Sequence, residues 1–220
     1  MNKNKPLFIT IEGGEGSGKT TQSILLKEYL EKKGFKVLRT REPGGTVLAE
    51  SIRQILLNPD SNLTPLSELL LYEAARSQHI SEIVLPALKK GKFVICDRFT
   101  DATIAYQGYG RKLDLQLINK LNTTASLELK PVLTIYLDIE PNVGLDKAKN
   151  LDKESYGKSG DRIERESLRF HKDVRKGYLS QAKKYPKRIK IIKTNPDVNK
   201  TWDLIKKEID KKISRHSRNS

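Results

Sequence analysis

The chain has one cysteine among its 220 residues, Cys96, and this scarcity excludes a fold held together by disulfides. Cys96 ends the apolar run Phe93 to Cys96, where a lone thiol is expected to be a small core residue. Long hydrophobic runs are also missing, since no stretch approaches the roughly 18 apolar residues of a membrane span. The start of the chain, Met1 to Pro6, is short and polar and lacks a signal-peptide hydrophobic region. We therefore expect a cytoplasmic protein without a membrane anchor.

The balance of charge is strongly basic, with 42 Lys and Arg against 27 Asp and Glu and a net charge of +15. Residues 147 to 220 carry most of the excess, because they hold 23 basic and 10 acidic residues. A basic surplus is compatible with attraction to nucleic acid or polyphosphate. Lysines spread over predicted helix faces are more typical of a solvated surface, so nucleic-acid binding is disfavoured.

Five short apolar runs alternate with helical patterns and polar stretches long enough to cross over a sheet. These runs are Leu7 to Glu12, Phe35 to Leu38, Phe93 to Cys96, Val132 to Leu137 and Ile189 to Ile192. The alternation predicts an α/β fold with a central parallel five-stranded sheet that helices cover on both faces. With 36% apolar residues, the chain can bury the core of one domain.

Helical spacing also runs from Leu66 to Lys90, and it places Tyr72 and Arg76 one turn apart on one face. Pro86 is expected to kink or end this helix. Between Lys149 and Arg162 the sequence is polar and contains two glycines, which predicts a mobile loop. Helical spacing resumes at Ile163, and residues 214 to 220 are expected to form a frayed basic tail.

The strongest motif follows the first predicted strand and precedes a helical pattern. It matches Gly-x-x-x-x-Gly-Lys-[Ser/Thr] and consists of Gly13, Gly14, Glu15, Gly16, Ser17, Gly18, Lys19 and Thr20. Glycines let backbone N–H groups and a helix N-terminus surround a phosphate, so we expect all eight residues to bind ATP. Lys19 would reach the β- and γ-phosphates, and the Thr20 hydroxyl would ligate Mg²⁺.

This phosphate loop does not identify the phosphoryl acceptor, because many enzyme classes share it. A signalling GTPase is disfavoured, since Asn119-Lys120 is followed by Leu121-Asn122 and no guanine-reading Asn-Lys-x-Asp motif results. At the end of the third strand, Asp97 and Arg98 lie at the carboxyl edge of the sheet, where such folds bind ligands. Asp97 would hold Mg²⁺ directly or through water, and Arg98 would contact phosphate.

Over nearly its whole length the chain resembles the thymidylate kinase family of P-loop nucleoside monophosphate kinases. The matching stretches are Thr40 to Thr46, Tyr72 to Arg76, Asp97 to Phe99, Ala105 to Arg111 and Asp161 to Glu164. The resemblance implies a P-loop kinase fold in which residues 1–220 form a single domain with a mobile lid at about 147–162. It also implies ATP- and Mg²⁺-dependent phosphorylation of dTMP to dTDP in dTTP biosynthesis, by a homodimer.

The same resemblance assigns roles in dTMP binding. Tyr72 would stack on the thymine ring and Arg76 would hydrogen-bond the base. Arg98 would grip the dTMP phosphate, Tyr106 would pack under the deoxyribose and Glu15 would meet the 3′-hydroxyl. The remaining substrate-binding residues line the pocket or shape the loop that closes over the acceptor, and they are Pro43, Arg53, Thr103 and Gln107.

The lid departs from the family pattern. Many bacterial members that carry a glutamate in the phosphate loop have arginines in the lid, whereas this stretch offers Lys147, Lys149, Lys153 and Lys158. Lysine neutralises charge on a phosphoryl group but lacks the bidentate fork of arginine. We expect Lys19, Arg98 and Glu15 to act in catalysis together with a lid cation. Arg162 and Lys149 are the named candidates, and the other three lid lysines stay open.

Two other functions stay open on the sequence alone. Another nucleoside monophosphate kinase, acting on dCMP or UMP, would share the phosphate loop and the fold. A non-catalytic P-loop protein that binds nucleic acid would account for the basic charge, and its DNA binding would depend steeply on salt.

Overall fold

The computed structural model describes residues 6–151 and 160–218, without the side chains of residues 150, 151 and 215–218. Five strands form one parallel sheet in the order β2-β3-β1-β4-β5. The strands are β1 (Phe8–Gly13), β2 (Val37–Arg41), β3 (Phe93–Asp97), β4 (Leu133–Asp138) and β5 (Ile189–Lys193). Each strand overlaps one of the five apolar runs, so the predicted sheet is confirmed.

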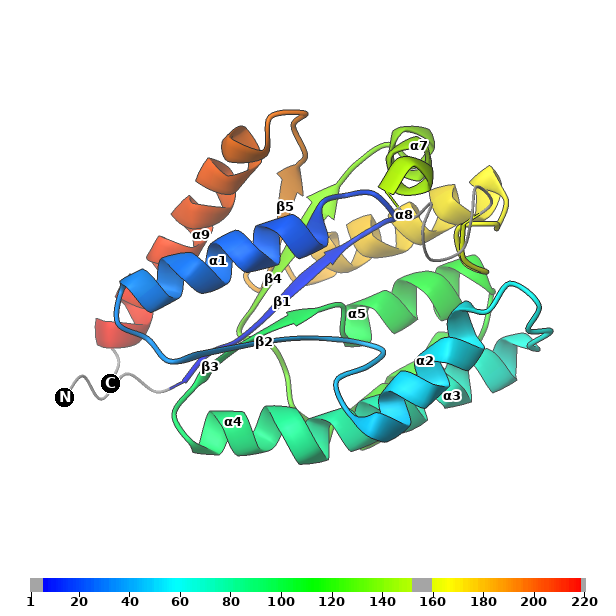
Figure 1. Cartoon of the computed structure of the whole chain (residues 1–220), viewed down its shortest axis with the longest axis horizontal. Helices are drawn as coiled ribbons and strands as arrows, with labels where there is room; N and C mark the ends of the chain where they lie inside the picture. Colours follow the sequence, from blue (N-terminus) through cyan, green and yellow to red (C-terminus); the bar gives the residue numbers. More distant parts are fainter. Residues whose placement is uncertain (1–5, 152–159, 219–220) are drawn as a thin grey trace.

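Helices cover both faces of this sheet (Figure 1). They are α1 (Lys19–Lys32), α2 (Val47–Leu57), α3 (Pro65–His79), the π-helical turn η1 (Ile80–Val84), α4 (Leu85–Lys89), α5 (Thr100–Thr103), the π-helical turn η2 (Ile104–Gly110), α6 (Leu115–Ala125), α7 (Pro141–Leu151), α8 (Leu168–Lys184) and α9 (Val198–Arg218).

Alternate residues of the central strand β1 face the two helix layers, as the pleat of a strand requires. Ile9 and Ile11 are buried in a core that includes residues of α1 and α9. Phe8 is buried in a second core with η1 and α4, and it packs edge-on against Phe99 at 5.0 Å. Because all five strands run in parallel, their carboxyl ends lie at one edge of the sheet, next to the loops that follow β1 and β3.

The predicted helix from Leu66 to Lys90 is one continuous helical segment made of α3, η1 and α4. The interruption expected from Pro86 takes the form of the π turn that directly precedes α4. Such turns are a local widening of a helix and mark the places where the regular hydrogen-bond ladder is broken. Arg76 and His79 therefore lie on the regular part of the helix, before the break.

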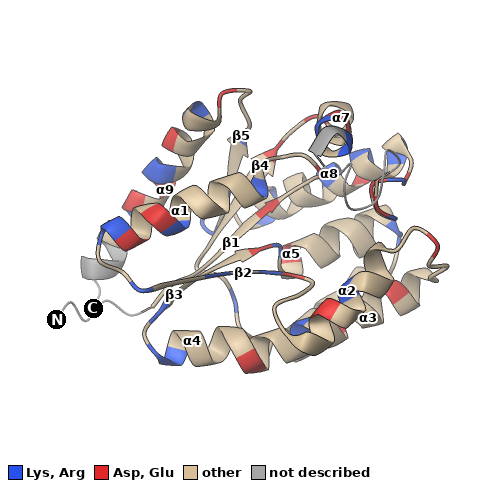
Figure 2. Ribbon diagram, viewed as in Figure 1, with Lys and Arg blue, Asp and Glu red and all other residues tan. Residues whose placement is uncertain are grey.

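The prediction of a frayed tail over residues 214–220 is wrong as far as Arg218, because α9 continues to that residue. Ile205 and Ile209 of α9 are fully buried and Ile213 is partly buried, a spacing of four residues that anchors one helix face along most of its length. Figure 2 shows basic and acidic residues interspersed on α1 and α9. Within the described ranges, no helix has the length and apolar character needed to cross a membrane.

Candidate active site

The phosphate loop connects β1 to α1 at the carboxyl edge of the sheet (Figure 1). Gly18 has a φ of +86° and Gly16 a φ of +62°, a left-handed conformation that glycine adopts without steric cost. A side chain at Gly16 would overlap the backbone carbonyl of Gly144 on α7. The glycines thus let the loop curve around a phosphate and also let α7 lie directly against it.

Lys19 begins α1, and its side chain folds back over the loop. The ammonium donates to the carbonyl oxygen of Gly14 at 2.8 Å and lies 3.5 Å from the Ser17 hydroxyl. Burial, reinforced by the nearby positive charge of Arg98, lowers the pKa of Lys19. A phosphate bound in the loop would supply the negative charge that this buried ammonium needs.

Thr20 and Asp97 come together from α1 and β3, as expected of residues that hold Mg²⁺. The Thr20 hydroxyl donates to Oδ2 of Asp97 at 3.3 Å. The other carboxylate oxygen, Oδ1, is buried without a hydrogen-bond partner in the described part of the chain. One hydroxyl and one carboxylate with an unsatisfied oxygen fit Mg²⁺, which prefers oxygen ligands and keeps several of its waters.

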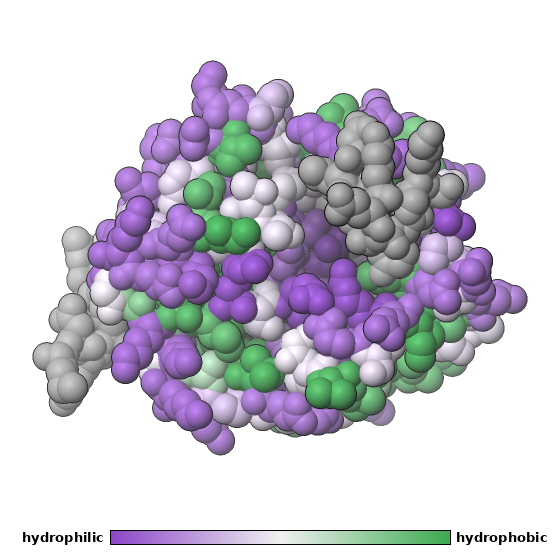
Figure 3. Space-filling model, in the orientation of Figure 1, coloured by the Kyte–Doolittle hydropathy of each residue, from purple (hydrophilic) through white to green (hydrophobic). Residues whose placement is uncertain are grey.

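A cavity of about 350 Å³ opens beside the phosphate loop. Figure 3 shows the surface hollowed between the α1 and α2 sides, with hydrophilic side chains at the rim. All nine residues predicted to bind the substrate line this cavity: Glu15, Pro43, Arg53, Tyr72, Arg76, Arg98, Thr103, Tyr106 and Gln107. Residues 16–20 of the phosphate loop line it as well, so the two predicted half-sites form one continuous space.

Glu15, Arg98 and Tyr106 form a compact polar group on the wall of the cavity. Nη2 of Arg98 donates to Oε1 of Glu15 at 2.6 Å, and the Tyr106 hydroxyl donates to the same oxygen at 2.7 Å. Burial alone would raise the pKa of Glu15, but the charges of Arg98 and Lys19 outweigh it and lower that pKa to about 2. Glu15 is therefore a carboxylate at neutral pH, and Arg98 has a fixed partner.

Arg76 lines the cavity, but most of its guanidinium is already engaged. Nε donates to Oε2 of Glu42 at 2.8 Å, while Nη1 donates to Oε1 of Glu73 and Oδ1 of Asn122, both at 2.7 Å. Nη2 donates to the Thr103 hydroxyl at 2.9 Å. A guanidinium has five N–H bonds, so one N–H on Nη2 is not used by these contacts.

The other predicted pocket residues differ in how they are held. Tyr72 is half-buried beside a cluster of apolar residues from α2 and α3. Nη1 of Arg53 donates to the carbonyl oxygen of Pro43 at 3.2 Å, which connects α2 to the loop after β2. Gln107 donates to Glu68 at 2.8 Å. Arg53 and Gln107 thus contribute to the shape of the cavity through bonds to their neighbours.

The two lid cations named above are not among the residues that line the cavity. Arg162 binds Oε2 of Glu68 at 2.6 Å and the carbonyl oxygen of Leu56 at 2.8 Å, and it does not line the cavity. Lys149 is exposed near the end of α7. Lys153 and Lys158 lie outside the described residues.

Lys147 lies closer to the phosphate loop than its neighbour Lys149. It follows Gly144 by three residues, which puts both on one face of α7. A Cβ built on Gly16 would lie 3.0 Å from the Cβ of Lys147, and Ala148, next in sequence, lines the cavity. The predicted loop from Lys149 onward also begins later than expected, because α7 extends to Leu151.

Sequence reasoning missed the two carboxylates and the amide that surround Arg76. Glu42 directly follows β2, Glu73 precedes Arg76 by three residues and Asn122 lies on α6. Glu42 and Glu73 lie within the stretches that resemble thymidylate kinases, so that resemblance was the available signal. Asp161, Ile163 and Glu164 also line the cavity, at the end of the lid.

Comparison with known proteins agrees with this arrangement. The family model of thymidylate kinase matches residues 11–205. A thymidylate kinase of Citrifermentans bemidjiense is 52% identical over 199 residues, which cover 90% of this chain and 88% of the relative. One from Gloeobacter violaceus is 48% identical over 204 residues, covering 93% and 94%.

Among solved structures, the crystal structure of thymidylate kinase from Ehrlichia chaffeensis matches with a TM-score of 0.75 and 37% identity, over 93% of this chain and 98% of that one. The predicted P-loop kinase fold is thereby confirmed. The family model, the curated relatives and the solved structure agree over nearly the whole chain, which belongs to the thymidylate kinase family.

Proposed function

We propose that this protein transfers the γ-phosphoryl group of ATP to the phosphate of dTMP, giving dTDP and ADP as a step toward dTTP. The observation that carries the proposal is a cavity of about 350 Å³ that joins the phosphate loop to Tyr72 and Arg76. A volume of this size is typical of small-molecule sites. Its two ends suit two different ligands, a polyphosphate and an aromatic base.

The proposed mechanism depends on positioning and on electrostatics, because phosphoryl transfer needs little covalent participation from the protein. A phosphate oxygen of dTMP attacks the γ-phosphorus while the bond to the β–γ bridging oxygen breaks. Lys19 would stabilise negative charge on the β- and γ-phosphates. Arg98, held by Glu15 and Tyr106, would align the acceptor phosphate.

Bound Mg²⁺ would neutralise phosphate charge, with Thr20 and Asp97 as the residues that hold it. The remaining side chains orient the acceptor: Tyr72 offers a ring face for thymine and Arg76 offers its unused N–H to the base. Tyr106 lies beside Arg98 and would pack under the deoxyribose. A lid over residues 147–162 would exclude water, which otherwise competes with dTMP for the phosphoryl group.

We also propose that residues 1–220 act as a single domain in the cytoplasm and associate as a homodimer. The support for a dimer, besides the family, is a set of large apolar side chains that α2 and α3 leave exposed: Val47, Leu48, Ile55, Leu66 and Leu70. Exposed apolar groups of this kind mark surfaces that contact other proteins. Sedimentation of the purified protein at several concentrations would test this part.

The decisive experiment is steady-state ATP consumption with a panel of acceptors: dTMP, dUMP, dCMP, UMP, AMP and none. We expect the highest kcat/KM with dTMP and only background consumption without an acceptor. Another acceptor that exceeds dTMP would replace this assignment with a different nucleoside monophosphate kinase. Salt-sensitive DNA binding without any ATP consumption would instead support the nucleic-acid-binding alternative.

A further inference from the structure

His79 lies at the end of α3, three residues after Arg76, and is fully buried. Its Nδ1 lies 3.0 Å from Oε1 of Glu42, and its Nε2 lies 2.7 Å from the hydroxyl of Thr40 on β2. The ring therefore connects α3 to the carboxyl end of β2 through two hydrogen bonds. Neither contact belongs to the phosphate-binding machinery described above.

The carboxylate of Glu42 lies between His79 and Arg76 and bonds to both. One carboxylate oxygen, Oε1, contacts His79, and the other, Oε2, accepts from Nε of Arg76 at 2.8 Å. The side chain is only 5% exposed, so water does not compete strongly for either oxygen. A rotation of the carboxylate would displace the acceptor of Nε, which is one of the four contacts that set the direction of the N–H of Arg76 left for the base.

His79 also supports the loop that follows β2. A Cβ built on Gly45 would lie 2.8 Å from Cδ2 of His79, so this glycine packs directly on the ring. Gly45 has a φ of +88°, which leaves the loop little freedom to accept another residue there. Two residues earlier, Pro43 lines the cavity. The imidazole is thus in contact with both structures that border the acceptor end of the site.

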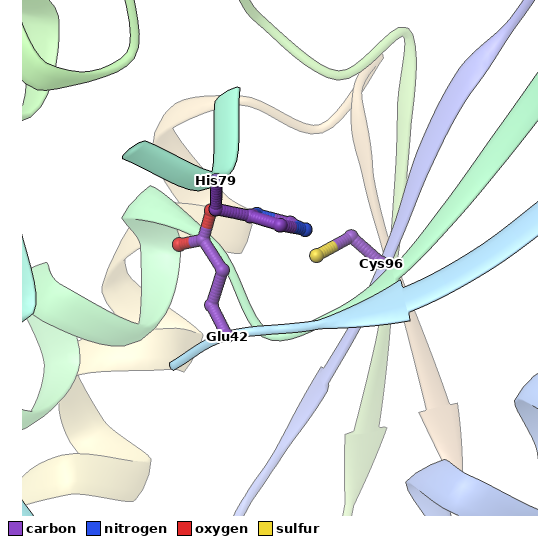
Figure 4. Close-up of side chains that lie close together, drawn as sticks. All are labelled: Glu42, His79 and Cys96. Carbon is purple, nitrogen blue, oxygen red and sulfur yellow. The ribbon is translucent and has the colours of Figure 1, made fainter. Parts of the chain in front are cut away.

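The same imidazole belongs to a group of three potential metal ligands, Glu42, His79 and Cys96, whose ligand atoms lie within 4.8 Å of one another (Figure 4). Each ligand atom is already engaged, since the Cys96 thiol donates to the carbonyl oxygen of Arg98 at 3.1 Å. Burial also raises the pKa of this thiol well above its usual range, which disfavours the thiolate a metal would need. Arg76 already supplies the positive charge that Glu42 requires. The arrangement is that of a hydrogen-bonded support.

We propose that His79 is a positioning residue for acceptor selectivity, which fixes Glu42 and the Pro43 loop so that the remaining N–H of Arg76 points at the base. This inference rests on the proposed function, because it concerns how the same site selects dTMP. His79 is not among the residues that line the cavity. Its loss should therefore affect recognition of the acceptor and leave the ATP half of the site unchanged.

Two substitutions separate the hydrogen bond to Glu42 from the rest of the ring. In His79→Asn the amide nitrogen takes a position close to that of Nδ1 and can still donate to Glu42. In His79→Gln the amide group reaches the position of Nε2, toward Thr40, and the donor to Glu42 is lost. A third variant, Thr40→Val, removes only the contact with Nε2 and keeps the shape of the side chain.

The measurements are KM for dTMP, KM for ATP and the ratio of kcat/KM for dTMP to that for dCMP. We expect His79→Gln to raise the dTMP KM and to narrow the dTMP-to-dCMP ratio, each by about tenfold or more. A loss of this size corresponds to a displacement of Arg76 by well under about 1 Å. His79→Asn should restore at least half of each effect on a logarithmic scale. The ATP KM should change less than about twofold in both, by the same principle.

The inference is overturned if His79→Gln keeps the wild-type ratio, if Asn and Gln behave alike, or if the ATP KM rises as much as the dTMP KM. Thr40→Val leaves the hydrogen bond to Glu42 in place and should keep a dTMP KM and ratio close to wild type. If His79→Gln does not fold, Glu42→Gln decides, because it replaces one of the two carboxylate oxygens that His79 and Arg76 share: a dTMP KM and ratio equal to wild type would then overturn the inference. Failure of the proposed function looks different, because wild type itself would then show no preference for dTMP.

Discussion

Nη2 of Arg98 donates to Oε1 of Glu15 at 2.6 Å, joining the end of β3 to the phosphate loop across 83 residues of sequence. Arg98 has a φ of +66°, an uncommon backbone conformation for a residue with a side chain. The ion pair and the backbone together hold the guanidinium at the wall of the cavity, so the arginine proposed to align dTMP is restrained before the substrate binds.

Glu15→Gln should weaken this restraint. The neutral amide keeps the shape of the side chain but loses the charge that holds Arg98, so we expect kcat/KM for dTMP to fall by about tenfold. The pKa of Glu15 is lowered to about 2, so the pair is intact above the carboxylate's ordinary range and is lost only as pH falls toward 2. The loss of activity should therefore be constant from pH 6 to 9. A loss that varies through this range would show that another group is responsible.

Lys19→Ala should lower kcat by roughly 10²-fold or more, because the β- and γ-phosphates lose the ammonium aimed at them. Circular dichroism and thermal melting should show an intact fold. Lys27→Ala is the matched control, since Lys27 is exposed on the same helix and forms a surface ion pair with Glu31. If Lys19→Ala retained a tenth of the wild-type kcat, the role of the phosphate loop would have to be reconsidered.

Arg76→Lys should narrow the preference for dTMP over dCMP. The lysine keeps a positive charge beside Glu42 and Glu73, whereas alanine would leave two buried carboxylates without their cation, at a cost of about 3 to 5 kcal/mol. Thymine has a carbonyl oxygen at C4 and cytosine has an amino group there, so a fixed N–H can donate to thymine but finds no acceptor on cytosine at that position.

For the wild-type enzyme we expect kcat/KM for dCMP to be at least about 10²-fold below that for dTMP. In Arg76→Lys the ratio should fall by about tenfold or more by the same argument. An unchanged ratio in a folded variant would show that Arg76 does not read the base.

Lys147→Ala should reduce kcat more than Lys149→Ala. Both lysines are exposed, but Lys147 shares the face of α7 that lies on the phosphate loop, whereas Lys149 lies on a different face of the helix. We therefore expect the ammonium of Lys147 to reach the transferring phosphoryl group. We expect about a 10²-fold loss for the first substitution and less than about twofold for the second. Equal losses would mean that α7 moves substantially when ATP binds.

Glu12→Gln should stabilise the protein at alkaline pH. Glu12 is fully buried, and desolvation, strengthened by the negative charge of Asp101, raises its pKa from 4.5 to about 8. Between these two values the folded state keeps a proton that the unfolded state has released, so the stability of the wild type falls as pH rises.

The free energy of unfolding of Glu12→Gln minus that of wild type should therefore grow from pH 5 to pH 8, by on the order of a few kcal/mol. Urea denaturation at several pH values measures this difference, and groups common to both proteins cancel. A difference that is independent of pH would contradict the raised pKa. Glutamine can retain the hydrogen bond from the amide of Phe99, which makes it the appropriate replacement.

The sequence was sufficient for the sheet because five apolar runs stand between helical patterns, and each run forms one strand. It was sufficient for the phosphate loop because that motif depends on local backbone conformation. The hydrogen-bond partners of Arg76 could not be predicted from a local pattern. Its partners Glu42, Glu73 and Asn122 come from three different segments, and only the packing of β2, α3 and α6 brings them together.

The sequence also did not predict which face of α7 lies against the phosphate loop. Whether Lys147 or Lys149 faces the phosphate depends on how the helix is rotated about its axis, and the contact between Gly16 and Gly144 sets that rotation. Arg162 illustrates the same limit, because its anchor Glu68 lies far away in the sequence on α3. Contacts of this kind carry no periodic signal along the chain.

Because neither Gly16 nor Gly144 has a side chain, the backbone of α7 lies in direct contact with the phosphate loop. A methyl group on either residue would clash with the opposite backbone and push α7, including Lys147, away from the phosphate loop. The distance between the positive charge of Lys147 and the bound phosphates therefore depends on the small size of two uncharged residues. A substitution at Gly16 or Gly144 should therefore change the rate of phosphoryl transfer although it alters no polar atom.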